Sequence, residues 1–128
     1  MKYTITTPLY YVNDKPHLGS SYTTIACDAL ARFNRLNGNN VLFLTGVDEH
    51  GQKIERTAEL KKLAPQVHCD EITLQYKYLW EKLNIKYDRF VRTSSPEHSI
   101  VVNNFYSKVL ESDDIYMGKK KWMVLCWM

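Results

Sequence analysis

The order of hydrophobic and polar positions along the chain predicts short strands separated by helices. Residues 2–6 form a β-branched run that is typical of a strand. Hydrophobic side chains then recur at helical spacing and predict a helix with one buried face, formed by Tyr22, Ile25, Ala26, Ala29, Leu30 and Phe33. Residues 37–40 predict a stop and a turn, and residues 41–45 are the continuous apolar run of a strand covered on both faces. We expect these two strands to be parallel, with a right-handed crossover.

The rest of the chain continues the same alternation. Residues 46–51 predict a polar loop at the end of the second strand, followed by a helix over 52–62. Pro65 suits the first turn of a helix to about residue 83, with five side chains available for burial: Val67, Tyr76, Leu79, Trp80 and Leu83. Residues 87–92 predict a third strand, and residues 94–97 predict the start of a helix that ends near Ser112. The fold class expected from this order is α/β with a parallel sheet.

A His-x-Gly turn precedes the first helix, at His17, Leu18 and Gly19. The first four N–H groups of a helix have no intrahelical partners and carry a partial positive charge, so phosphates bind there readily. Gly19 has no Cβ and lets the backbone approach a flat base or sugar. The turn therefore predicts a nucleoside triphosphate site, although a Pro-His turn can also serve only to cap the helix.

Composition narrows the classes of function. With 128 residues, 45% hydrophobic and 24% charged, the chain is typical of one soluble globular domain. Its net charge of +3 would be zero without the three lysines at 119–121, so composition does not indicate nucleic-acid binding. The three cysteines are far apart in the sequence and predict neither a disulfide framework nor a metal site. No membrane-spanning or secretory segment is expected, and a reducing cytoplasm fits best.

Two motifs in succession resemble a known family. Residues 16–20, Pro-His-Leu-Gly-Ser, resemble the His-Ile-Gly-His signature of class I aminoacyl-tRNA synthetases. Residues 45–54, Thr-Gly-Val-Asp-Glu-His-Gly-Gln-Lys-Ile, resemble the second block of the methionyl-tRNA synthetase family. Residues 8–13 and 89–98 extend the resemblance to the bacterial form of that family, over about residues 3–118. The joint spacing is the strong signal, because a His-x-Gly turn alone also occurs in other adenylyl-transferring Rossmann proteins.

The resemblance implies methionine–tRNA ligase activity, in which methionine and ATP form methionyl-adenylate and methionine is then transferred to tRNA(Met). ATP, accompanied by Mg²⁺, would bind at His17, Gly19 and Ser20. The catalytic residues would be His17, which would donate to phosphate oxygens, and Ser20. Gly19 would form the floor under the adenosine. No protein-bound metal is expected from the residues of this fragment, and the oligomeric state stays open.

The family also assigns methionine-binding residues. Asp48 would hold the α-amino group through a charge-assisted contact, and Leu9 and Tyr11 would line the thioether pocket. Simpler roles stay open for all three, since Asp48 and Glu49 could cap the following helix and the other two could be ordinary packing at a strand end.

Ser20 departs from the family signature, which commonly ends in a second His. A hydroxyl can donate one hydrogen bond but carries no positive charge, so we expect Ser20 to act as a helix cap and phosphate donor. Lost activity is the alternative, because removing one electrostatic donor from a transition state costs on the order of 3 kcal/mol.

The domain organisation expected from the resemblance has two parts. Residues 1–118 would be the N-terminal part of the catalytic, nucleotide-binding domain: the N-terminal half of a Rossmann-like parallel sheet, truncated before the second half. Residues 119–128 do not resemble the family's continuation and predict an aberrant tail, such as a shifted reading frame would produce. The isolated fragment is expected to be inactive, since the loop lysines that would neutralise pyrophosphate are absent. The alternatives are a non-catalytic ATP- or methionine-binding fragment, a pseudogene product, or another Rossmann adenylyltransferase.

Overall fold

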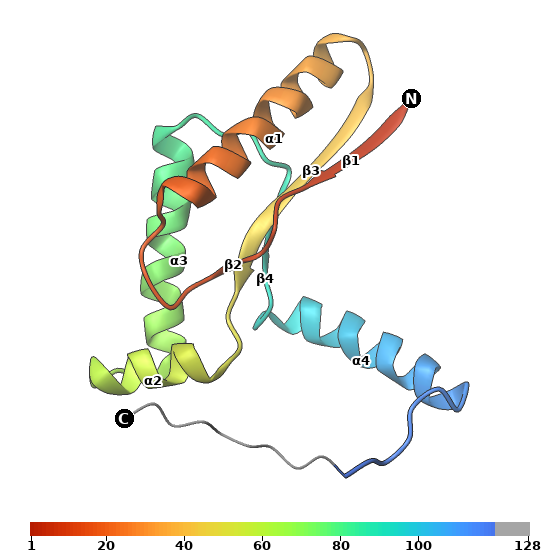
Figure 1. The fold of residues 1–128 in the computed structure, drawn as a ribbon. Helices are drawn as coiled ribbons and strands as arrows, with labels where there is room; N and C mark the ends of the chain where they lie inside the picture. The colour runs from red at the N-terminus through yellow and green to blue at the C-terminus, as the bar shows by residue number, and fades with distance from the viewer. Residues whose placement is uncertain (120–128) are drawn as a thin grey trace.

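The structure, a computed structural model, describes residues 1–119 and has the α/β fold expected from the sequence (Figure 1). Its elements in chain order are β1 (Lys2–Thr6), β2 (Tyr10–Tyr11), α1 (Leu18–Leu36), β3 (Asn40–Asp48), α2 (Gln52–Leu60), α3 (Pro65–Lys82), β4 (Arg89–Arg92) and α4 (Pro96–Glu111). The tail predicted for residues 119–128 lies outside the described residues, apart from its first lysine.

The sheet is parallel throughout and is built around β3. Leu44 pairs with Thr6 on one side and with Arg89 on the other, so β1 and β4 flank opposite edges of β3. The parallel pairing of β1 with β3 confirms the prediction. Two boundaries were wrong: the two-residue strand β2 was not expected, and β3 continues through residues 46–48, which were predicted to be loop. Both differences arise because β2 supplies hydrogen-bonding partners to this end of β3.

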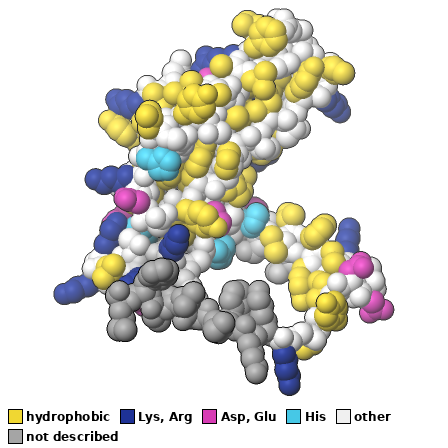
Figure 2. Space-filling view, in the orientation of Figure 1, with side chains coloured by type: hydrophobic (Ala, Val, Ile, Leu, Met, Phe, Trp, Pro, Cys, Tyr) yellow, Lys and Arg dark blue, Asp and Glu magenta, His cyan; other side chains and the backbone are white. Residues whose placement is uncertain are grey.

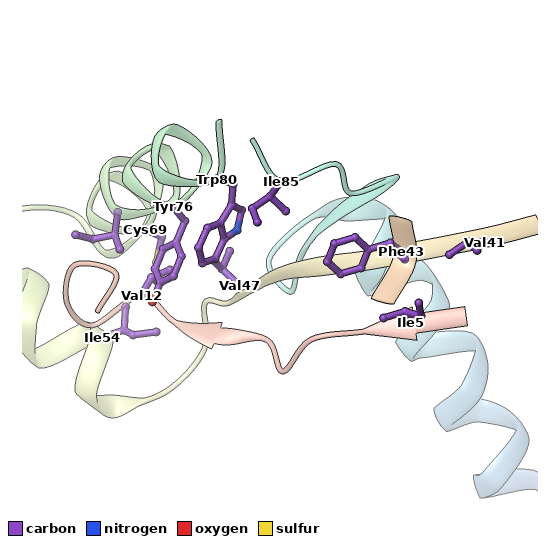
Figure 3. Packing of buried hydrophobic residues seen from close by; sticks show 12 residues of the cluster. Ile5, Val12, Val41, Phe43, Val47, Ile54, Cys69, Tyr76, Trp80 and Ile85 are labelled. Carbon is purple, nitrogen blue, oxygen red and sulfur yellow. The ribbon is translucent and has the colours of Figure 1, made fainter. Parts of the chain in front are cut away.

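The core lies between the sheet and α3 (Figure 3). Tyr76 and Trp80 of α3 are buried, as the sequence predicted, and Tyr10 stacks on Tyr76 with ring centroids 5.6 Å apart. Val67 of the same helix and Leu83, its C-cap residue, are exposed, contrary to expectation. The buried apolar side chains around this stack come from β1, β3, α2, α3 and two loops: Ile5, Val12, Val41, Phe43, Val47, Ile54, Cys69, Ile72 and Ile85.

Helix α1 buries the opposite face from the one predicted. The six hydrophobic residues that were expected to be buried, from Tyr22 to Phe33, are all exposed, and Figure 2 shows hydrophobic side chains gathered over this helix. The buried face is largely polar and carries Ser20, Thr24, Asp28, Ala31 and Asn34. This face is stable because its polar groups are paired: the Thr24 hydroxyl lies 2.9 Å from the Tyr10 hydroxyl, and Asp28 accepts a 2.8 Å bond from the amide of Lys86.

The expected covering of β3 on both faces was also wrong for part of the strand. Val41 and Phe43 are buried, whereas Leu42, which points to the other face, is exposed. Helix α4 contributes no buried residue, and in Figure 1 it extends away from the body of the molecule. Of the helices in residues 1–119, none combines the length and the hydrophobicity that crossing a bilayer requires.

Candidate functional site

The two predicted motifs lie at the carboxyl ends of the parallel strands. The chain leaves β2 at Tyr11 and enters α1 through the His17 turn, while β3 ends at Asp48. Tyr11 is the register partner of Asp48 in the pairing of β2 with β3. In open α/β sheets, ligands bind outside these strand ends. The structure therefore brings Tyr11 and Asp48 together, and the candidate site is built on adjacent strands.

His17 is the N-cap of α1. Its backbone is extended, and its Nδ1 atom accepts a 3.0 Å hydrogen bond from the amide of Gly19. Since Nδ1 is the acceptor, the neutral ring carries its proton on Nε2. The exposed imidazole thus satisfies one of the free helix amides and keeps one N–H donor for a ligand.

Ser20 completes a capping box with His17. Its hydroxyl accepts from the His17 amide at 3.2 Å and donates to the His17 carbonyl at 3.0 Å. The side chain is buried, at 1% exposure for the residue. Ser20 therefore serves the cap from the third helical position, and a contact with phosphate would require its single proton to leave the His17 carbonyl.

Gly19 makes room for the His17 ring. A Cβ atom built on Gly19 would lie 2.9 Å from Cε1 and 3.1 Å from Nδ1 of that ring. The absence of a side chain at this position thus allows the imidazole to fold back onto the helix end. This steric role comes in addition to the close ligand approach expected from the sequence.

The substitution Gly19→Ala is expected to displace the His17 ring, because the new methyl group would overlap it. Alanine is the better helix former by about 1 kcal/mol, so ring position is a better measurement than melting temperature. In ¹³C-resolved NMR spectra, the Cε1–H signal of His17 should shift and the protection of the residue 19 amide should fall. Thr23→Ala, one turn later on α1, is the control, and an unmoved His17 signal in Gly19→Ala would contradict the prediction.

Asp48 is held by the end of β4. Its Oδ1 atom accepts a 3.1 Å hydrogen bond from the Thr93 hydroxyl, and the His50 amide lies 3.4 Å from the same oxygen. The Nε2 atom of His50 lies 3.2 Å from the Thr93 carbonyl, which can only accept, so the imidazole donates this bond. The loop then ends at Gly51, whose φ of 127° favours glycine.

Glu49 is the buried charge of this region, with a side chain that is 0% exposed. Arg92 donates three hydrogen bonds of 2.7–3.1 Å to its carboxylate, and the hydroxyls of Ser94 and Thr73 donate at 2.5 and 3.0 Å. Burial raises the pKa of Glu49, but these hydrogen bonds and the charge of Arg92 lower it more, and the pKa lies below its ordinary value. Glu49 is a structural anion that connects the end of β3 to β4.

Arg92 adds a further residue of α3 to this network. It also donates a charge-assisted bond, of 2.5 Å, to Asp70, and that bond is the main reason that the pKa of Asp70 is lowered. Hydrogen bonding to Glu49 is the main reason that the pKa of Arg92 is raised. Sequence reasoning considered Glu49 only as a helix cap and missed the network. No local pattern could have found it, since Arg92 is 43 residues from Glu49.

A cavity of about 440 Å³ opens beside this loop. It is lined by Tyr11, Asn13, His50, Gly51, Gln52, Lys53 and Ile54. Its volume lies in the range of small-molecule sites. Tyr11 is the one residue of the predicted methionine pocket that lines it; Leu9 is outside its lining and partly exposed.

Comparison with known proteins identifies the family of the chain. The family described as tRNA synthetases class I (M) matches residues 3–126. The chain belongs to the methionyl-tRNA synthetase family of class I, bacterial type. It is 59% identical to the methionine–tRNA ligase of Thermosynechococcus vestitus over 93% of this chain and 22% of that protein. Identity is 52% to the chloroplastic/mitochondrial methionine–tRNA ligase of Arabidopsis thaliana, over 89% of this chain and 18% of the relative.

Solved structures of the methionyl-tRNA synthetase family share the fold. The methionyl-tRNA synthetase of Mycobacterium tuberculosis bound by methionyl-adenylate is 36% identical, with a TM-score of 0.89. The match covers 91% of this chain and 23% of that chain. This chain thus spans less than a quarter of the length of the synthetases that it matches. The match confirms the Rossmann-like fold class. It excludes the alternative that the chain belongs to another family of Rossmann adenylyltransferases.

Proposed function

We propose that this chain supplies the N-terminal part of the catalytic domain of a methionine–tRNA ligase, formed by residues 1–118. The observation that carries the proposal is the arrangement at the strand ends: β2 ends at Tyr11 and leads to the capped turn of His17 at the start of α1, and Asp48, the register partner of Tyr11, ends the neighbouring β3. A helix N-terminus that attracts phosphate and a carboxylate that attracts an ammonium group suit ATP and an amino acid.

In the proposed reaction, a methionine carboxylate oxygen attacks the α-phosphorus of ATP, a new P–O bond forms, and the bond to pyrophosphate breaks. The protein contributes alignment and charge stabilisation, with no covalent intermediate on the enzyme. His17 would donate from Nε2 to phosphate oxygens, and Gly19 would lie under the adenosine. Ser20 would act mainly by holding His17 in place, because its hydroxyl bonds to the His17 backbone.

Methionine would bind beside the same strand ends. Asp48 would take the ammonium group, and Tyr11 and Leu9 would contact the thioether side chain. Mg²⁺ enters the proposal as the companion of the ATP phosphates, and tRNA(Met) as the acceptor of the activated methionine. A cytoplasmic setting is part of the same proposal.

A non-hydrolysable methionyl-adenylate analogue tests the proposal. Calorimetric titration of the 128-residue chain should show binding, and His17→Ala should weaken it roughly tenfold, because a hydrogen bond to a charged group is lost. His98→Ala, which removes an imidazole from α4, is the matched control. No binding by the unsubstituted chain, or equal loss in both variants, would refute the assigned site.

Methionine-dependent exchange of pyrophosphate into ATP separates catalysis from binding. We expect no exchange above background from this chain alone, because it spans 22% of the length of the relative from Thermosynechococcus vestitus. Exchange at a measurable rate would instead show that these residues suffice for activation. Binding of methionine without exchange is the result that both candidates predict, the proposed part of a ligase and a non-catalytic ATP- or methionine-binding fragment.

A further inference from the structure

The carboxylate of Asp48 is oriented asymmetrically by its neighbours. Its Oδ1 atom accepts the hydrogen bond from the Thr93 hydroxyl and faces the amide of His50. In the part of the chain that the structure describes, Oδ2 receives no hydrogen bond. One oxygen is therefore committed to the protein, and the other keeps its lone pairs for a cation.

The direction of the Thr93 hydroxyl follows from its second contact. The amide of Glu49 donates a 2.8 Å hydrogen bond to Thr93 Oγ1, so this oxygen is already an acceptor. The hydroxyl proton is then free to point at Asp48, and the 3.1 Å distance to Oδ1 is that of a hydrogen bond. One hydroxyl thus links the backbone of Glu49 to the carboxylate of Asp48.

The position of Thr93 is fixed by its burial, its backbone hydrogen bond and the contacts of its chain neighbours. It is 9% exposed, and its amide donates to the Val47 carbonyl at 3.3 Å. Its chain neighbours Arg92 and Ser94 both bond to the buried carboxylate of Glu49. Residues 92–94 therefore clamp residues 48–50, and the hydroxyl lies at the centre of the clamp. A positioning group needs this kind of support from its surroundings.

We infer that Thr93 is a positioning residue that fixes the rotamer of Asp48 and so turns the free Oδ2 toward the ammonium group of an amino-acid substrate. The inference rests on the proposed function of Asp48. In this role Thr93 acts through Asp48 and not by contact with the substrate. Its hydroxyl removes the rotational freedom that a partly buried carboxylate would otherwise lose on binding.

The variants Thr93→Val and Thr93→Ser test the inference in the 128-residue chain. Valine keeps the shape and removes the hydroxyl, whereas serine keeps the hydroxyl. The first readout needs no ligand: the Hα–Hβ coupling constants of Asp48, measured by NMR, should report one rotamer in the unsubstituted chain and in Thr93→Ser. They should average in Thr93→Val. Thr4→Val, on the exposed side of β1, is the control.

The second readout is affinity for methionine and for 4-(methylsulfanyl)butanoate, which is methionine without its amino group. Thr93→Val should weaken methionine binding roughly tenfold and leave the analogue unchanged, and Thr93→Ser should restore the affinity. Unaveraged couplings of Asp48 in Thr93→Val would overturn the positioning role, whatever the affinities are. Equal affinity of the unsubstituted chain for both compounds would overturn the ammonium-binding role of Asp48 instead.

Discussion

Replacing Arg92 with methionine is expected to lower the free energy of unfolding by about 3 kcal/mol, because it leaves the buried carboxylate of Glu49 without its cation. Methionine keeps most of the length of arginine, so packing changes little. The lower end of the range for broken buried pairs applies, since the Arg92 side chain is 27% exposed. Urea denaturation followed by circular dichroism measures the change.

Two comparisons isolate the charge effect. Arg89→Met removes an exposed arginine from the same strand and should change stability by less than about 0.5 kcal/mol. Adding Glu49→Leu to Arg92→Met should recover about 2 kcal/mol, because no buried charge then lacks a partner. An Arg92→Met variant as stable as Arg89→Met would show that the network contributes little.

The same network predicts how stability changes with pH. The pKa of Glu49 in the folded chain lies below its ordinary value of 4.5. Its contribution is therefore complete near neutral pH and is lost as the pH falls below 4.5 and through the folded pKa. Asp70, whose pKa is also lowered, acts in the same direction. In Arg92→Met, the acid side of the stability curve should be flatter than in the unsubstituted chain.

The sequence pattern predicted the features that depend mainly on residues close together in the chain. The parallel pairing of β1 with β3 follows from two apolar runs joined by a helix. The capping role of His17 could be expected because a polar side chain just before a helical pattern can serve the free amides of the helix start. Its steric detail, in which Gly19 leaves room for the ring, depends on a side-chain conformation that no spacing encodes.

Predictions from the sequence pattern were wrong where contacts between distant segments determine which residues are buried. Hydrophobic periodicity selected the wrong face of α1, because the buried Thr24 and Asp28 are paired with Tyr10 and Lys86 from other elements. The role of Glu49 was missed for the same reason, since its partners come from α3 and from the end of β4. A polar residue is tolerated in the interior once it is paired, and that pairing is a property of the fold.

The substitution Gly46→Ala is expected to lower the free energy of unfolding by about 3 kcal/mol, through a steric clash between strands. Gly46 is the register partner of Val91, and a Cβ on Gly46 would lie 2.1 Å from the Val91 carbonyl oxygen. Relief would require backbone movement, which flanking bonds oppose: the Asp88 amide donates to Phe43 at 2.8 Å and the Thr93 amide to Val47 at 3.3 Å.

The effect of Gly46→Ala should reach the candidate site, because β4 carries Arg92 and leads into Thr93. Urea denaturation gives the loss of stability, and hydrogen exchange should show faster exchange of the Thr93 amide than in the unsubstituted chain. Gly118→Ala is the matched control, since a Cβ at Gly118 meets no atom of residues 1–119 within 4 Å. If Gly46→Ala were as stable as Gly118→Ala, β3 and β4 could separate without cost, and the clamp on Asp48 would not depend on their close approach.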